Sequence, residues 1–205
     1  MMQVVFKRGG MGVHTPVVAG LMTGLAMVVG LLGCASTPRQ PSPYTSLSAD
    51  ARDTVEAERL HREASALMGT DPERAEALLR EALTADLFYG PAHNNLGVLH
   101  LRAGRLYDAA GEFEWACKLM PGQPDPRVNL ALVLESAGRT HDAIDAYATA
   151  LEIAPGYLPA IQGMASLQLR TGNADHRTRG LLDEISMRGA PTWRDWAVDH
   201  LSRAR

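Results

Sequence analysis

The side chains of this 205-residue chain that could do chemistry are seven histidines and two cysteines, Cys34 and Cys117. The histidines are scattered, and neither a His-Glu-x-x-His pair nor a Cys-x-x-Cys pair is present to hold zinc. The sequence also lacks the Gly-x-Ser-x-Gly elbow of hydrolases and the Gly-x-x-x-x-Gly-Lys loop that binds phosphate. We therefore expect no catalytic residue, no metal site and no cofactor, and we interpret Cys117 as a packed thiol.

Cys34 suggests a different kind of chemistry, because it follows an apolar leader. Residues 1–33 contain Lys7 and Arg8, no acidic residue, and an apolar run from Val17 to Leu32. A basic start and a short apolar core are typical of a secretory signal peptide, and the run is shorter than the roughly 20 residues of a spanning helix. We expect cleavage, with an uncleaved signal anchor as the alternative. Both interpretations place the rest of the chain outside the cytoplasm.

The sequence Leu31-Leu32-Gly33-Cys34 resembles the lipobox of bacterial lipoproteins. The resemblance implies that the leader is removed before Cys34, which is then acylated and anchors the protein to a membrane. Ala35 stands where an inner-membrane lipoprotein would carry Asp, so the resemblance implies the outer membrane, facing the periplasm. Residues 34–48 are rich in Ser, Thr and Pro, which predicts an acylated cysteine followed by a disordered tether.

The charge balance excludes another class of partner. Without Lys7 and Arg8 of the leader, 18 basic and 23 acidic residues remain. Nucleic-acid binding depends on neutralising phosphates with a basic surface. We therefore expect no nucleic-acid partner. Because Cys117 is then the single cysteine after Cys34, no disulfide can form within the rest of the chain.

The elements that must position any binding residues form a repeat of fixed period. The pattern Gly-Arg-x-x-Asp-Ala occurs at residues 104–109 and again, 34 residues later, at 138–143. Ten positions of the two aligned repeats are identical. From Ala49 onward the pattern is helical, with glycines marking breaks every 14 to 21 residues. Gly104 and Gly138 can adopt the left-handed conformation that ends a helix. A helical unit of about 34 residues predicts a stacked repeat that presents a binding surface.

The units 90–123 and 124–157 resemble tetratricopeptide repeats. The characteristic positions of that family are occupied by Leu96, Gly97, Ala109, Phe113, Ala116 and Pro121 in the first unit, and by Leu130, Ala131, Ala143, Tyr147, Ala150 and Pro155 in the second. Alanine and glycine at these positions let helices approach closely, and Phe113 or Tyr147 fills the wider gap. His93 and His100 replace aromatic core residues of the family, so we expect both to be structural.

The resemblance implies an all-α fold, a right-handed superhelical solenoid of antiparallel helix pairs over residues 49–190. Two less typical units, at 56–89 and 158–190, would flank the two clear ones. A C-terminal helix over 191–205 would cap the stack. Trp193 and Trp196 share a face of this helix, and we expect them to close the open end, with a separate docking surface as the alternative.

In this family the first helix of each repeat lines a concave face. The matching positions are Pro91, Asn94, Val98, Leu101, Arg102, Asp125, Val128, Leu132, Glu135, Ser136, Pro159, Gln162, Ser166, Leu169 and Arg170. The candidate partner-binding groove consists of Asn94, Val98, Leu101, Arg102, Val128, Leu132, Glu135, Leu169 and Arg170. An apolar patch with a polar rim suits a short helix or an extended strand. The alternative is that the five apolar side chains pack against a neighbouring helix or the N-terminal helix, Asp50 to Met68.

These observations predict a membrane-anchored adaptor or scaffold of a bacterial cell envelope, which binds an envelope protein or peptide in its concave groove. The groove lacks one specific clamp, because Asn94 and Val98 stand where the chaperone-tail type of groove needs Lys and Asn. Three alternatives stay open: a pilotin-like assembly factor, a glycan-binding or peptidoglycan-associated factor, and a structural protein that self-associates through its last helix.

Overall fold

The computed structural model describes residues 52–203, which form nine α-helices and no strand. The helices are α1 (Thr54–Leu67), α2 (Pro72–Ala85), α3 (Gly90–Arg102), α4 (Leu106–Leu119), α5 (Asp125–Ser136), α6 (Thr140–Ile153), α7 (Leu158–Thr171), α8 (His176–Arg188) and α9 (Pro191–Arg203). The predicted all-α solenoid of helix pairs is confirmed. The leader, Cys34 and the tether lie outside the described residues.

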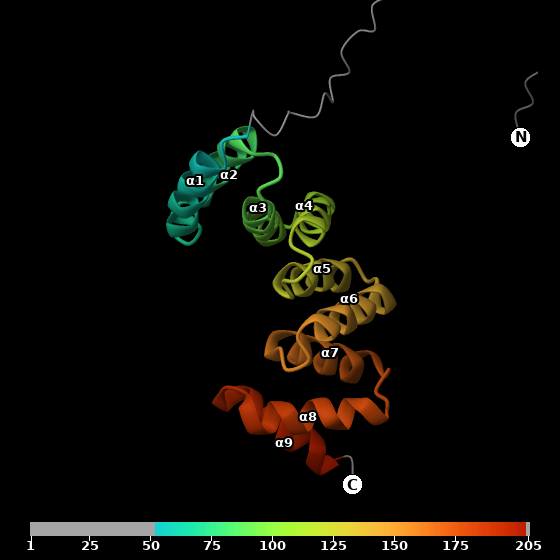
Figure 1. The fold of residues 1–205 in the computed structure, drawn as a ribbon. Coiled ribbons are helices and arrows are strands. Elements are labelled where there is room, and N and C mark those ends of the chain that lie inside the picture. The colour runs from blue at the N-terminus through green and yellow to red at the C-terminus, as the bar shows by residue number, and fades with distance from the viewer. Residues whose placement is uncertain (1–51, 204–205) are drawn as a thin grey trace, which may run out of the picture. The chain divides into compact units, whose positions relative to one another are not determined.

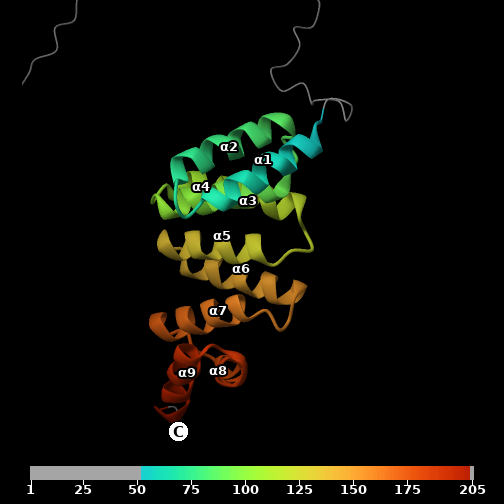
Figure 2. The same cartoon turned by 90° about the vertical axis from the view of Figure 1, so that its left-hand side faces the viewer.

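The helices stack in the order of the sequence (Figure 1). The most extensive contacts lie within the pairs α1 and α2, α3 and α4, and α5 and α6, and the second helix of each pair packs on the first helix of the next. Figure 2 shows these pairs as successive layers of the stack. At the C-terminal end α8 packs more extensively on α9 than on α7, so α9 takes the place of a further repeat.

Local signals in the sequence set the helix boundaries. The carboxylate of Asp71 accepts a hydrogen bond from the backbone N–H of Arg74 at 3.0 Å and caps the start of α2. Gly104, Gly138 and Gly172 have φ angles of 72°, 75° and 72°. This left-handed conformation is easily adopted by glycine. The three glycines are spaced by one repeat and end the first helices α3, α5 and α7.

The core is built from small residues and a few large ones. Phe113 and Tyr147 are fully buried, and the alanines at the characteristic repeat positions around them have no exposed surface. Among the characteristic positions, Gly97 lies against the ring of Phe113, so α3 and α4 approach closely there. Cys117 of α4 is half-buried, and burial raises the pKa of its thiol above the ordinary value, as expected for a packed cysteine.

The two histidines that replace aromatic core residues are both buried and hydrogen-bonded. His93 Nδ1 lies 2.7 Å from a carboxylate oxygen of Glu112 on α4, and its Nε2 lies 2.9 Å from the carbonyl oxygen of Leu87. His100 Nδ1 accepts a hydrogen bond from Arg105 Nε at 2.9 Å. Their positions are those of structural residues that tie a first helix to neighbouring segments.

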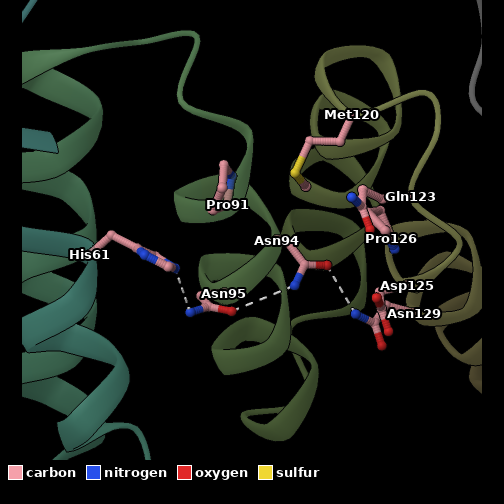
Figure 3. A pocket seen from close by; sticks show the side chains of 9 residues that line it. All are labelled: His61, Pro91, Asn94, Asn95, Met120, Gln123, Asp125, Pro126 and Asn129. Carbon is pink, nitrogen blue, oxygen red and sulfur yellow. Dashed lines mark hydrogen bonds between the residues drawn. The ribbon is translucent and has the colours of Figure 1, made fainter. Parts of the chain in front are cut away.

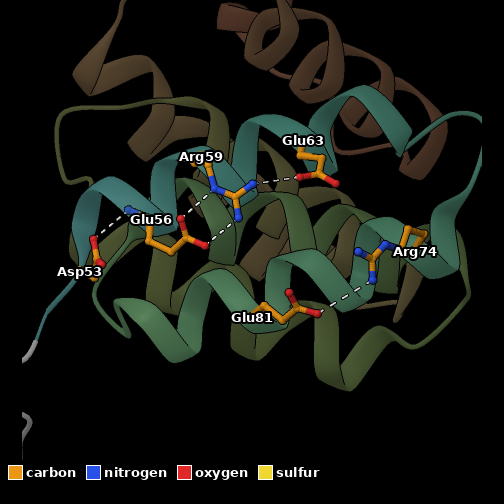
Figure 4. A network of polar contacts seen from close by, with 6 residues as sticks. All are labelled: Asp53, Glu56, Arg59, Glu63, Arg74 and Glu81. Carbon is orange, nitrogen blue, oxygen red and sulfur yellow. Dashed lines mark hydrogen bonds and ion pairs between the residues drawn. The ribbon is translucent and has the colours of Figure 1, made fainter.

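The outer surface of the first pair carries exposed ion pairs. Arg59 of α1 bridges Glu56 and Glu63, and Arg74 of α2 faces Glu81 (Figure 4). Such exposed pairs contribute little to stability because water screens them. Within residues 52–203 no helix has the length and apolar character needed to cross a membrane, and no cluster of three or more metal-ligating side chains occurs.

Candidate functional site

The first helices of successive pairs lie side by side and form one continuous surface, since α1 contacts α3, α3 contacts α5 and α5 contacts α7. We call this surface the first-helix face. Two of its hollows differ in the polarity of their linings. The polar hollow, about 420 Å³, is lined by His61, Pro91, Asn94, Asn95, Met120, Gln123, Asp125, Pro126 and Asn129. The apolar hollow, about 270 Å³, is lined by Val128, Leu132, Glu135, Tyr147, Pro159, Gln162, Gly163, Ser166 and Trp193.

A chain of side-chain amides crosses the polar hollow and joins three repeats (Figure 3). Asn129 of α5 donates from Nδ2 to Asn94 Oδ1 at 3.0 Å, and Asn94 donates from Nδ2 to Asn95 Oδ1 at 3.5 Å. Asn95 then donates to His61 Nε2 at 2.9 Å and to Ser65 Oγ at 3.0 Å, both on α1. We call the connected side chains of Asn129, Asn94, Asn95 and His61 the amide chain. Each amide has two N–H donors and a carbonyl acceptor. Both N–H groups of Asn95 are engaged, whereas Asn94 and Asn129 each use one N–H within this chain of bonds and keep the other for a further bond.

His61 ends the amide chain as a neutral acceptor. Burial is the main influence on the imidazole and lowers its pKa, although Glu58 nearby acts in the opposite direction. Because Asn95 donates to Nε2, the proton of the neutral ring resides on Nδ1. With His61 neutral, the one charged side chain in the lining of the polar hollow is the carboxylate of Asp125; the lining contains no lysine or arginine.

Other bonds on the first-helix face also join neighbouring repeats. The hydroxyl of Tyr157 donates to the carboxylate of Asp125, and burial together with this bond raises the pKa of Tyr157 to about 12. Arg170 of α7 pairs with Glu135 of α5. Each bond joins residues 32 to 35 positions apart, close to one repeat. The repeats are thus held in register by polar contacts on the surface that carries the hollows.

The predicted groove residues have three different surroundings. Asn94 lines the polar hollow, and Val128, Leu132 and Glu135 line the apolar hollow. The two arginines line neither hollow. Arg170 forms an ion pair with Glu135 of the apolar hollow, and Arg102 donates a hydrogen bond to the carbonyl oxygen of Met68 at 3.1 Å. Val98, Leu101 and Leu169 are half-buried and pack against core clusters inside the stack. Of the five apolar residues, Leu132 is the most exposed, at 39%.

The hollows include nine of the fifteen residues that the repeat positions indicate, together with several that sequence reasoning missed. Four of the missed residues follow the repeat period, because one repeat separates each from the next: His61, Asn95, Asn129 and Gly163. Asn95 and Asn129 are visible in the sequence as identical positions of the two clear repeats. Their neighbours on adjacent helices follow from the stacking, which the sequence does not specify.

The apolar hollow continues toward the last helix. Ser166 and Trp193 line both this hollow and a smaller one of about 200 Å³ that also includes Thr192 and Trp196. The rings of Trp193 and Trp196 meet edge to face with centroids 5.2 Å apart. Both tryptophans also pack partly against the core beneath α9, so they cover the end of the stack; Trp193 borders both hollows, and Trp196 borders the smaller one.

Comparisons with known proteins agree with this fold. No protein-family model matches the chain. The TPR repeat-containing thioredoxin TTL4 of Arabidopsis thaliana is 34% identical over 85 residues, which are 42% of this chain and 12% of that protein. The match therefore spans a small part of that relative's length.

Solved structures share the arrangement over more of the chain. MamA has a TM-score of 0.53 at 23% identity, covering 72% of this chain and 75% of its own. The first TPR of Spaghetti (RPAP3) bound to an HSP90 peptide has a TM-score of 0.57 at 14% identity, covering 60% and 98%. A mutant O-GlcNAc transferase of Thermobaculum terrenum has a TM-score of 0.60 at 27% identity, covering 65% and 26%. The described residues thus share the TPR-like solenoid fold of these structures.

Proposed function

We propose that this tetratricopeptide-repeat solenoid is a protein-interaction adaptor, which binds an extended polypeptide segment of a partner along its first-helix face. The observation that carries the proposal is the amide chain from Asn129 to His61 in the polar hollow. A side-chain amide presents an N–H and a C=O as a peptide unit does, so a row of amides can pair with the backbone of a bound strand. Such pairing does not depend on the partner's side chains.

The electrostatics of the polar hollow support a peptide more than an acidic ligand. Asp125 is its one charged lining residue, and His61 is neutral. An anion would find no arginine or lysine there to pair with. The RPAP3 domain shows that a solenoid of this fold can hold a peptide. Its partner is an HSP90 peptide, whereas Asn94 and Val98 here lack the carboxylate clamp of chaperone-tail grooves.

We propose further that the chain is exported and anchored through an acylated Cys34, in a bacterial cell envelope. The support is the leader and the lipobox-like residues before Cys34. An anchored solenoid with a binding face would hold its partner close to the membrane. The periplasmic face of the outer membrane is the proposed location, because Ala35 follows the cysteine.

The adaptor function is tested by photo-crosslinking in cells. A photoreactive residue at Leu132, which lines the apolar hollow, is compared with one at Glu114, an exposed site on a second helix. We expect one dominant envelope protein to be captured from Leu132 alone, with capture reduced by Asn129→Ala. No capture at Leu132 by a folded, membrane-bound protein, or equal capture at both sites, would contradict the proposal.

The anchor is tested separately by mass spectrometry of the mature N-terminus. We expect a chain that begins at an acylated Cys34, and a Cys34→Ser variant that leaves the membrane fraction. Cys117→Ser is the matched control, because this half-buried cysteine lies within the solenoid. An intact leader, or membrane retention of Cys34→Ser, would count against acylation.

A further inference from the structure

The first-helix face changes character at Gly163. This glycine follows Asn129 by one repeat, so it occupies the position at which the amide series of His61, Asn95 and Asn129 would continue. A Cβ atom on Gly163 would lie 2.6 Å from the hydroxyl oxygen of Tyr147 and closer still to its ring. Because Gly163 has no side chain, the fully buried Tyr147 ring can lie directly beneath the first-helix face, next to the apolar hollow.

The apolar hollow lies at this position, because Gly163 and Tyr147 both belong to its lining. Val128, Leu132 and Pro159 add apolar side chains to the lining. The one charged lining residue, Glu135, pairs with Arg170 and accepts a hydrogen bond from the Tyr147 hydroxyl at 3.4 Å. Burial is the main cause that raises the pKa of Tyr147, and the nearby negative charge of Glu135 is the second. The hydroxyl therefore stays protonated and donates a hydrogen bond to the Glu135 carboxylate.

The last helix completes the hollow. Trp193 of α9 forms part of the wall opposite α5, and Ser166 of α7 lies at the junction with the smaller hollow beside Trp196. At about 270 Å³ the hollow is smaller than the roughly 300 to 1,000 Å³ of small-molecule sites. Its size suits one bulky side chain, and tryptophan is a frequent anchor residue where such side chains bind.

Charge restricts the partner further. The lining of the polar hollow contains the carboxylate of Asp125 and no lysine or arginine, whereas Glu135 in the apolar hollow is already paired with Arg170. The residues that remain after the expected leader also carry more acidic than basic side chains. A segment with a negative net charge would therefore be repelled along this face, and one with a positive net charge attracted.

From these observations we infer that the apolar hollow is the anchor pocket for one bulky apolar side chain of an extended, positively charged segment of a protein partner. The inference rests on the proposed peptide-binding function and specifies its partner. It assigns α9 a second role, in which Trp193 contacts the anchor as well as covering the end of the stack. Backbone pairing at the amide chain and side-chain recognition at the apolar hollow then act on the same segment.

The test is selection of a displayed library of random peptides on the purified wild-type protein. We expect enriched peptides to share one aromatic, Leu, Ile or Met residue and a positive net charge. Synthetic peptides of the enriched sequence then measure affinity for the variants. Ser166→Arg, which places a long cation at the junction of the two hollows, should weaken binding at least tenfold, as should Trp193→Ala. Val198→Ala changes an exposed residue of α9 outside both hollows and should bind as wild type.

Two results separate this inference from the proposed function. The anchor pocket would be overturned if the enriched peptides bound Ser166→Arg and wild type equally. It would also be overturned if the peptides lacked a bulky apolar residue, or if their net charge were negative. Peptide binding itself would remain intact in each case. No enriched peptide, or peptides indifferent to Asn129→Ala, would overturn the peptide-binding function as well. Thermal melts of each variant identify any loss of binding that comes from unfolding, and Ser166→Arg at a half-exposed site keeps the test valid if Trp193→Ala unfolds.

Discussion

The ring of Phe113 occupies the space that a side chain on Gly97 would need. A Cβ atom built on Gly97 would lie 2.7 Å from Cε1 and 2.8 Å from Cδ1 of that ring. Both residues are buried inside the pair formed by α3 and α4. Glycine is thus required at this position because of close packing, since its φ angle is an ordinary helical one.

The first prediction follows from this contact. Gly97→Ala should destabilise the protein by about 1 to 3 kcal/mol, because the added methyl group overpacks a rigid core. Gly111→Ala is the matched control: Gly111 is also within a helix, is exposed, and leaves open space where a Cβ atom would be added. It should stabilise the protein by about 0.5 to 1 kcal/mol through helix propensity. Urea unfolding of the three proteins measures both effects, and equal changes would contradict the packing argument.

A second prediction concerns the buried imidazole of His93. Glu112→Ala removes the carboxylate that faces Nδ1 at 2.7 Å, and should cost about 1 to 3 kcal/mol because a buried polar group loses its partner. Glu114→Ala, two residues along the same helix at an exposed site, should change stability by no more than about 0.5 kcal/mol. Thermal unfolding compares the two. A similar loss in both variants would show that the His93 contact has no special value.

A third prediction concerns stability at alkaline pH. Burial and the bond to Asp125 raise the pKa of Tyr157 from 10 to about 12 in the folded protein. The folded state therefore holds the proton more tightly than the unfolded state, and this contribution is complete below pH 10 and lost as the pH rises toward 12. Tyr157→Phe should make the alkaline loss of stability smaller. Tyr107→Phe, at a tyrosine that is 92% exposed, is the matched control. Urea midpoints across this pH range decide.

A fourth prediction concerns the start of α8. Asp175 accepts hydrogen bonds from the backbone N–H groups of Arg177 and Thr178, and the Thr178 hydroxyl accepts one from the backbone N–H of Asp175. Asp175→Ala breaks this capping box and should lower the stability of the protein. Asp183→Ala, exposed within the same helix, should have little effect. Because α9 packs on α8, amide hydrogen exchange in α9 should accelerate in Asp175→Ala and not in Asp183→Ala. Unchanged exchange in Asp175→Ala would show that the cap of α8 does not stabilise α9.

Much of the fold can be predicted because its signals are local. The sequence predicts that Gly104 and Gly138 end helices, and both do so with positive φ. It also predicts that Phe113 and Tyr147 fill gaps between helices, and both are fully buried. Each of these predictions depends on a residue type and its place within one repeat, and residue type and spacing are what a sequence pattern records.

The candidate site is harder to predict because it depends on contacts between elements. Leu169 occupies an expected groove position of its repeat, yet it packs against the core below α9, which no repeat pattern describes. Trp193 covers the end of the stack as predicted, but its position beside Ser166 depends on how α9 lies against α7. The role of Gly163 becomes visible when its neighbour Tyr147 is placed, because a missing side chain leaves no signal of its own.

The three left-handed glycines at 104, 138 and 172 have a consequence for how such a chain can change its length. They are spaced by one repeat and have nearly the same backbone angles, so the chain leaves each first helix in the same direction. A gene segment encoding residues 104–137 could therefore be copied in tandem, and both new joints would reproduce a turn that the protein already makes. The copy would bring a second Asn129 with it, one repeat further along the first-helix face. Adding whole repeats in this way would lengthen the first-helix face. Its two ends would stay as they are, including the apolar hollow beside Trp193.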